Sequence, residues 1–112
     1  MAYPQVASGI VTPSLNPVAV TAATYTAKNG DLIEFGGGAS TVVTLPAVSQ
    51  GGVVVVLNQV GTFTVTVKTA EGTNTIAGIL GSTGYVVPAG GTGTSQTQAT
   101  FVADGTNWQR VA

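Results

Sequence analysis

The stretch TFTVTVK at residues 62–68 decides the fold class of this chain. Its apolar residues alternate with threonines and a lysine, which is the period-two pattern of a β-strand that has one face in a core and the other in water. Phe63, Val65 and Val67 are expected to point inward, and the threonines to form a ladder outside. No window of helical length lacks glycine, proline or β-branched clusters, so the sequence predicts no helix longer than a turn.

Similar short runs, rich in valine, threonine and isoleucine, lie on both sides of this stretch and are separated by turn residues. The run VVVVLN at 53–58 is almost continuously apolar, which is typical of a strand buried on both faces. The last two runs are expected to form a hairpin across residues 104–107. The expected strands are 18–26, 31–35, 41–45, 53–58, 62–68, 75–77, 84–87, 96–103 and 108–111. Together they predict an all-β fold, a small antiparallel β-sandwich of the jelly-roll kind.

The N-terminal region differs from the rest. Residues 1–17 hold three prolines and show no sustained period, which predicts an extended arm in front of a single sandwich domain at 18–112. An extended apolar segment can lie across a neighbouring subunit or add a strand to its sheet edge, so the arm is the candidate capsid or subunit contact. The residues assigned to that contact are Val6, Ile10, Val11 and Leu15. A disordered terminus is the other interpretation, and the sequence does not separate the two.

Charged side chains are scarce. The chain has 3 Lys and Arg and 4 Asp and Glu among 112 residues, so charged residues make up 6% of it, whereas about 25% is usual. A soluble domain that stands alone normally covers itself with charges of both signs. Either hydroxyl and amide side chains hydrate this surface, or other subunits cover much of it.

The composition also excludes several classes of function. A net charge of −1 leaves no basic patch for phosphates, so nucleic acid is not an expected partner. With no Cys and no His, thiolate or imidazole catalysis and Cys/His zinc sites are excluded, and neither an enzyme nor a cofactor is expected. The first twenty residues lack Lys and Arg, and the longest apolar run is too short to span a bilayer. We therefore expect a soluble protein made in a cytoplasm, without a membrane partner.

The carboxylates and glycines offer no catalytic pattern. Asp31 and Glu34 are three residues apart, and odd spacing in a strand places them on opposite faces, so they are not expected to act together. Glu71 and Asp104 stand next to glycine in expected turns. The glycine runs at 36–38 and 90–93 lack the lysine of a phosphate-binding loop. No catalytic, metal-binding or cofactor-binding residue is assigned.

The aromatic residues are the remaining candidates. Tyr25, Tyr85 and Trp108 are able to stack on sugars, but aromatics in a small sandwich more often serve the core or an interface. Trp108 is interpreted first as a core or subunit-interface anchor, because it combines a large apolar area with one N–H donor. Tyr85 and Trp108 are the candidate interface or glycan contacts.

The order of elements over 18–112 resembles a β module of phage virion proteins that is found in tail fibres, head fibres and capsid decoration proteins. The matching features are Tyr25, Asn29-Gly30-Asp31 before an apolar strand, Thr44-Leu45-Pro46-Ala47 after the next, Gly51-Gly52 before the valine-rich strand, and Asp104-Gly105-Thr106-Asn107-Trp108. The resemblance implies an antiparallel sandwich, often trimeric, that serves assembly, virion stability or host contact.

The resemblance and the shortage of charge favour a non-enzymatic structural protein of a tailed bacteriophage virion. The leading hypothesis is a capsid decoration (cement) protein that sits on the capsid exterior as a homotrimer, with the major capsid protein or other virion proteins as partners. The alternative is a tail-fibre or adsorption protein that binds host surface glycans through Tyr85, Trp108 and the loop at 89–95. A polysaccharide-degrading tailspike fragment is disfavoured by the short chain and the few carboxylates.

Overall fold

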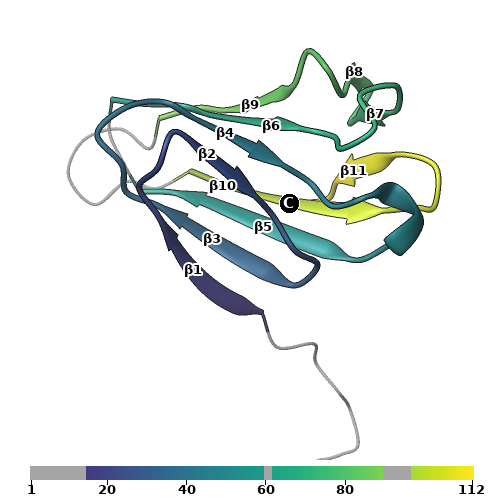
Figure 1. Ribbon diagram of the computed structural model, residues 1–112, viewed down its shortest axis with the longest axis horizontal. Helices are drawn as coiled ribbons and strands as arrows, with labels where there is room; N and C mark the ends of the chain where they lie inside the picture. Colours follow the sequence, from purple (N-terminus) through teal and green to yellow (C-terminus); the bar gives the residue numbers. More distant parts are fainter. Residues whose placement is uncertain (1–14, 60–61, 90–96) are drawn as a thin grey trace, which may run out of the picture.

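The computed structural model describes residues 15–59, 62–89 and 97–112, which form two packed β-sheets (Figure 1). Within these ranges the only helical element is one short 3-10 turn, η1 (Val48–Gln50). The strands are β1 (Asn16–Val20), β2 (Thr24–Thr26), β3 (Asp31–Phe35), β4 (Thr41–Thr44), β5 (Val53–Asn58), β6 (Val65–Lys68), β7 (Thr75–Ile76), β8 (Ile79–Leu80), β9 (Tyr85–Val87), β10 (Thr97–Ala103) and β11 (Trp108–Arg110). The predicted all-β class is confirmed.

The chain alternates between the sheets over its first half. The larger sheet has the order β1-β3-β5-β10-β11-β7-β8, and the smaller one the order β2-β4-β6-β9. From β1 to β6 each strand lies in the sheet opposite to the strand before it, so the chain runs out along one layer and back along the other (Figure 1). Strands in the same layer therefore run in the same direction, and β1, β3 and β5 pair in parallel, as do β2, β4 and β6.

The expectation of an antiparallel, jelly-roll-like sandwich is therefore wrong, because the sheets are mixed. Antiparallel pairing joins β10 to β5 and β11, β9 to β6, and β7 to β8. The expected strand at 18–26 is also wrong as one element. It divides into β1 and β2, which lie in different sheets. Side-chain alternation reports which face of a strand is buried, but it does not report which strand is the neighbour.

Several expected elements have the bounds that the sequence indicated. The strands at 31–35 and 53–58 appear as β3 and β5. The predicted C-terminal hairpin is formed by β10 and β11, which pair antiparallel with Phe101 opposite Arg110. β1 begins at Asn16, so the last two residues of the expected arm are already part of the larger sheet.

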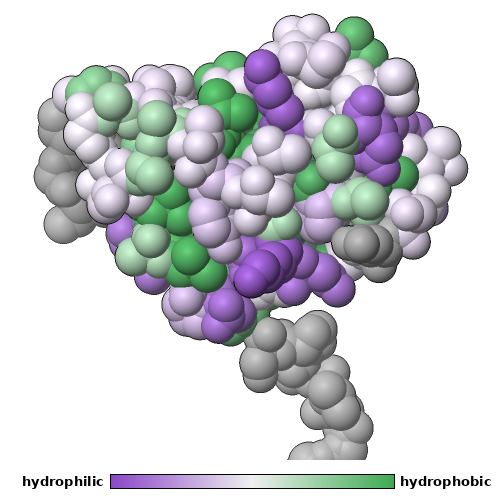
Figure 2. Space-filling model, in the orientation of Figure 1, coloured by the Kyte–Doolittle hydropathy of each residue, from purple (hydrophilic) through white to green (hydrophobic). Residues whose placement is uncertain are grey.

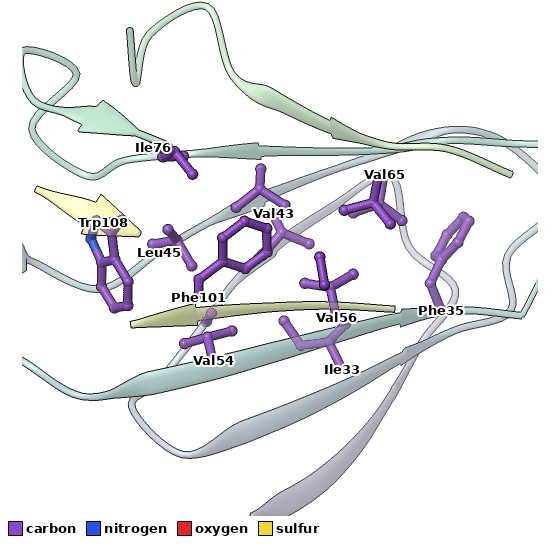
Figure 3. Packing of buried hydrophobic residues seen from close by; sticks show 14 of the residues in the cluster. Ile33, Phe35, Val43, Leu45, Val54, Val56, Val65, Ile76, Phe101 and Trp108 are labelled. Carbon is purple, nitrogen blue, oxygen red and sulfur yellow. The ribbon is translucent and has the colours of Figure 1, made fainter. Parts of the chain in front are cut away.

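The core fills the space between the sheets (Figure 3). Alternate residues of most strands enter it, whereas both residues of β8 are exposed. Val65 and Val67 are fully buried while Thr66 keeps partial exposure, as the pattern at 62–68 predicted, but β6 begins at Val65, so the expected strand starts three residues too early. Burial of each such valine, leucine, isoleucine or phenylalanine contributes about 1.5–3 kcal/mol relative to exposure. The largest fully buried side chains are Trp108, Phe35, Phe101, Ile33, Leu45, Ile76, Val43, Val54, Val56, Val65, Val67 and Val87.

Two parts of the quoted resemblance meet in space. The side-chain Oδ1 of Asn29 accepts a hydrogen bond of 2.9 Å from the backbone N–H of Val53 at the start of β5. Gly52 has a φ of 109°, and a Cβ at this position would overlap the amide of Asn29. Glycine is therefore required where the turn before β3 lies against the turn before β5.

Candidate interaction surfaces

The larger sheet has a second face, turned away from the core, that is mostly apolar. One row across neighbouring strands reads Pro17, Leu32, Val55 and Thr100, in register from β1 to β10. The next row reads Ala19, Glu34, Leu57 and Gln98, and Val53 pairs with Val102 further along. We call this surface the outer apolar face, and its apolar members are Pro17, Ala19, Leu32, Val53, Val55, Leu57 and Val102.

Val55 lies at the centre of the outer apolar face. It is only 5% exposed, yet it does not belong to the core cluster between the sheets, which takes Val54 and Val56 from the same strand. The alternation along β5 places Val55 on the opposite side, with Leu32 and Thr100 as its register neighbours. In residues 15–59, 62–89 and 97–112 every strand belongs to one of the two sheets, so no further layer covers this face.

One charged side chain lies on the outer apolar face. Glu34 is half-buried between Ala19 and Leu57 in the register. It forms no hydrogen bond or ion pair within the part of the chain that the structure describes. The predicted separation of Asp31 and Glu34 is confirmed, since Asp31 faces the other way and is buried.

The smaller sheet presents a different outward surface. Its register rows are Thr24, Val42, Thr66 and Val86, and then Thr26, Thr44 and Lys68. We call these seven residues the threonine face. Threonines from three strands line this surface, and Thr66 of the predicted ladder is among them, but Val42, Lys68 and the 51% exposed Val86 lie on it as well. In the space-filling view, near-neutral side chains make up most of the visible surface and strongly hydrophilic ones gather in a few places (Figure 2).

Trp108 is a core residue. Its side chain is fully buried and packs in the cluster that includes Leu45 and Phe101 (Figure 3). The indole Nε1 is buried and has no hydrogen-bond partner within the described ranges. This placement corrects the assignment of Trp108 as an interface or glycan contact, because an enclosed ring is not available to a partner or a sugar. The core interpretation of Trp108 holds.

Tyr85 lies apart from Trp108, in β9 of the smaller sheet. Its half-buried ring meets Phe101 edge to face, with the ring centroids 5.5 Å apart. Arg110 donates from Nη1 to the Tyr85 hydroxyl at 2.7 Å, and its guanidinium carbon is 5.7 Å from the ring centroid. Arg110 itself is exposed. The structure therefore places an aromatic ring beside a cation near the C-terminal end of the described chain, and this pairing was not predicted.

Tyr25 and Asp31 connect the two sheets. The Tyr25 hydroxyl donates to Asp31 Oδ2 at 2.7 Å, and the Lys28 backbone N–H donates to the same oxygen at 2.9 Å. Burial raises the pKa of Tyr25 to about 12, with further contributions from the hydrogen bond and the charge of Asp31. Tyr25 packs against the core, so the preferred core role of this aromatic is confirmed.

The other two acids stabilise turns. Asp104 accepts hydrogen bonds from the backbone N–H groups of Asn107 and Thr106, and these bonds lower its pKa. For Glu71, burial alone would raise the pKa, but the backbone N–H of Val48 and the amide of Asn74 lower it. Each carboxylate thus has a structural role in a loop, as expected.

The predicted arm contacts lie mostly outside the described residues. Val6, Ile10 and Val11 fall in residues 1–14, which the structure does not describe. Leu15 is described, and its side chain is 37% exposed. Among residues 15–59, 62–89 and 97–112, no three acids lie close enough together to hold a metal ion, and no helix is long and apolar enough to cross a membrane.

No protein-family model, curated protein or solved structure matches this chain.

The residues of the outer apolar face were not assigned from the sequence. The continuous apolar run at 53–57 was the available indication, since it predicted burial on both sides of β5 but not the second layer that would cause it.

Proposed function

We propose that this chain is a structural protein of a tailed bacteriophage virion, and that it decorates the capsid exterior as a homotrimer. It carries out no catalysis and holds no cofactor. Its partners are further copies of itself and the major capsid protein or another virion protein. Its role is to reinforce the shell by covering surface at subunit and lattice contacts.

The outer apolar face is the observation that carries the proposal. Leu32, Val55 and Leu57 form an apolar surface on a sheet whose other side is already filled by the core. Leu32 and Leu57 keep partial exposure around the nearly buried Val55, and contiguous apolar surface on the outside of a monomer marks interaction sites. The scarcity of charge supports the same conclusion, because the chain exposes 5607 Å² of surface with seven charged residues in total. The phage assignment itself rests on the sequence resemblance.

Sedimentation with emptied phage capsids tests the proposal. We expect saturable binding of the purified chain and a rise in the temperature at which the capsids open. Three linked contacts bind far more tightly than one, by factors of about 10²–10⁴. Leu32→Lys should weaken binding by a factor of this order, because a charge on the outer apolar face prevents the copies from associating and leaves one contact per chain, whereas the matched variant Thr66→Lys on the threonine face should bind like the parent chain. Absence of binding by the parent chain would refute the capsid role.

A tail-fibre or adsorption role is the second candidate, and Tyr85 with Arg110 is the observation that favours it. A partly exposed ring beside a guanidinium offers a stacking surface and N–H donors to a sugar. Binding of the purified chain to surface glycans on an array, lost in Arg110→Ala and kept in Lys68→Ala, would select this function over decoration.

A further inference from the structure

We propose that the outer apolar face is the acceptor for residues 1–14 of a second copy of this chain. The inference rests on the proposed homotrimer and adds which surfaces meet in it. The arm of each subunit lies across the outer side of β3, β5 and β10 of the next subunit.

The acceptor surface is suited to an apolar, uncharged segment. Val55 is already 95% enclosed by its surroundings on the larger sheet, and the half-buried Leu32, Leu57, Val53 and Val102 surround it in the register. A segment placed across these residues removes their remaining apolar area from water, at about 25 cal/mol for each Å². Only Glu34 brings charge to this surface, and it has no partner among the described residues.

The composition of residues 1–14 complements this face. The segment contains no Asp, Glu, Lys or Arg, and it offers Val6, Ile10 and Val11 as apolar side chains. Gln5 and Thr12 supply N–H and O–H donors for Glu34, and no acid of the segment repels it. An extended segment of this length reaches about 45 Å, while the distance from β1 to β10 is three strand spacings, or about 14 Å. The segment is therefore long enough to cross the whole face.

The chain enters the larger sheet at its edge strand β1, and the first described residues are exposed. Asn16 is tied to the sheet through its backbone N–H, which donates to Gly30 O at 2.7 Å. The residue before it, Leu15, is 37% exposed, and Asn16 and Pro17 are exposed as well. These side chains are therefore open to contact with a neighbouring copy.

Pairing of an arm with the free edge of β1, where the chain enters the larger sheet, is disfavoured. Asn16 N–H and Val20 O bond toward the β3 side, so the intervening Pro17 and Ala19 present their backbone groups to the open edge. Proline has no N–H, and this edge therefore offers a single donor, on Ala19. A proline at this position is a common protection against strand addition.

Arm exchange of this kind occupies every arm only in a closed assembly. The donor is the N-terminal segment and the acceptor is a different patch, so each arm contact joins two unlike surfaces. Such contacts close as a pair when two copies exchange arms, or as a ring when each copy passes its arm to the next. The proposed homotrimer corresponds to the threefold ring, in which every arm and every outer apolar face is occupied.

Disulfide trapping tests the proposal directly, because the natural chain has no cysteine. In the full-length double variant Ile10→Cys/Leu57→Cys, mild oxidation should link different chains and give a covalent trimer on a denaturing gel without reductant. The matched variant Ile10→Cys/Thr66→Cys directs the same arm cysteine to the threonine face, and it should stay monomeric on that gel with its thiols free. Equal linking in both variants, or linking of Ile10→Cys to Leu57→Cys within one chain only, would overturn the inference.

A second variant removes any dependence on the fold of the acceptor. Ile10→Asp/Val11→Asp alters only the arm, and it should reduce the molecular mass in solution from three chains to one without changing the β-sheet circular dichroism spectrum. An unchanged mass overturns the inference. Capsid sedimentation separates the two proposals: chains that crosslink between copies but never bind capsids refute the decoration role alone, while capsid binding without crosslinking refutes the arm exchange alone.

Discussion

The two outward surfaces of this molecule are built from the same kind of strand but end in different chemistry. On the threonine face, Thr44 and Thr66 alternate with fully buried valines of the core. On the outer apolar face, Val55 and Leu57 occupy the equivalent outward positions of β5. Valine and threonine have nearly the same shape and both favour strands. Folding therefore accepts either residue, and the proposed contact between copies accounts for the apolar residues of the outer apolar face.

The largest expected effect is on assembly. Leu57→Lys places an ammonium group on the outer apolar face and should convert the proposed trimer to monomers, because burial of an unpaired charge under a partner is costly. Thr66→Lys, the matched change on the threonine face, should leave the mass unchanged. Analytical ultracentrifugation of both variants measures the difference. Equal behaviour of the two variants would remove the distinction between the faces.

Exchanging valine and threonine should lower the free energy of unfolding on the outer apolar face but hardly change it on the threonine face. Val55→Thr introduces a hydroxyl at a position that is 5% exposed, and the expected loss is about 1–2 kcal/mol in the free energy of unfolding. Thr66→Val occurs at a half-exposed position, and surface changes of this kind stay within about 0.5 kcal/mol. Urea unfolding of the two variants provides the comparison, and equal losses would show that Val55 is not enclosed.

The hydrogen bond from Tyr25 to Asp31, which links the two sheets, should be sensitive to alkali. The folded chain raises the pKa of Tyr25 from 10.0 to about 12, so the fold favours the protonated phenol. This stabilisation is complete below pH 10 and is lost as the pH rises from 10 to 12. Tyr25→Phe should cost about 1–2 kcal/mol at neutral pH, because the buried Asp31 loses a donor.

The alkaline effect is measured as the difference between the two chains. Unfolding free energies of the parent and Tyr25→Phe should converge between pH 10 and 12, since the parent loses an interaction that the variant lacks. Parallel curves over that range would contradict the role given to the Tyr25 hydroxyl.

The smallest expected effect lies in the hairpin between β10 and β11. The pKa of Asp104 is lowered from 3.8 by backbone N–H groups, so its contribution to stability is present above pH 3.8 and is lost as the pH falls below that value. Asp104→Asn keeps one acceptor oxygen for the turn and should flatten the acid limb of the stability profile, with little change at pH 7. An acid limb identical to that of the parent would contradict this role.

The sequence predicts those features that depend on local pattern. The bounds of β3 and β5, the hairpin of β10 and β11, and the inward side of β6 follow from side-chain alternation and turn residues. The parallel pairing does not follow from such patterns, because it depends on the chain changing sheets at the break between Val20 and Thr24. Residues 21–23 contain no glycine, proline or other turn signal that would have predicted the passage from one sheet to the other.

The candidate surfaces were predictable only in part. The charge shortage indicated a surface that is either hydrated by hydroxyl and amide side chains or covered by other subunits, but it did not indicate which part of the surface. Leu32 and Val55 become one surface only when β3 pairs beside β5. The sequence left Trp108 between the core and a subunit interface, and its complete burial decides for the core. The role of Tyr85 likewise depends on Arg110, which lies 25 residues away in the sequence.

The mass of the full-length chain in dilute solution tests the central claim most directly. If partners of its own kind cover the outer apolar face, size-exclusion chromatography with light scattering gives a single peak with the mass of three chains of 11.0 kDa each. A stable, monodisperse peak at 11.0 kDa, unchanged as the protein concentration rises, would contradict that claim.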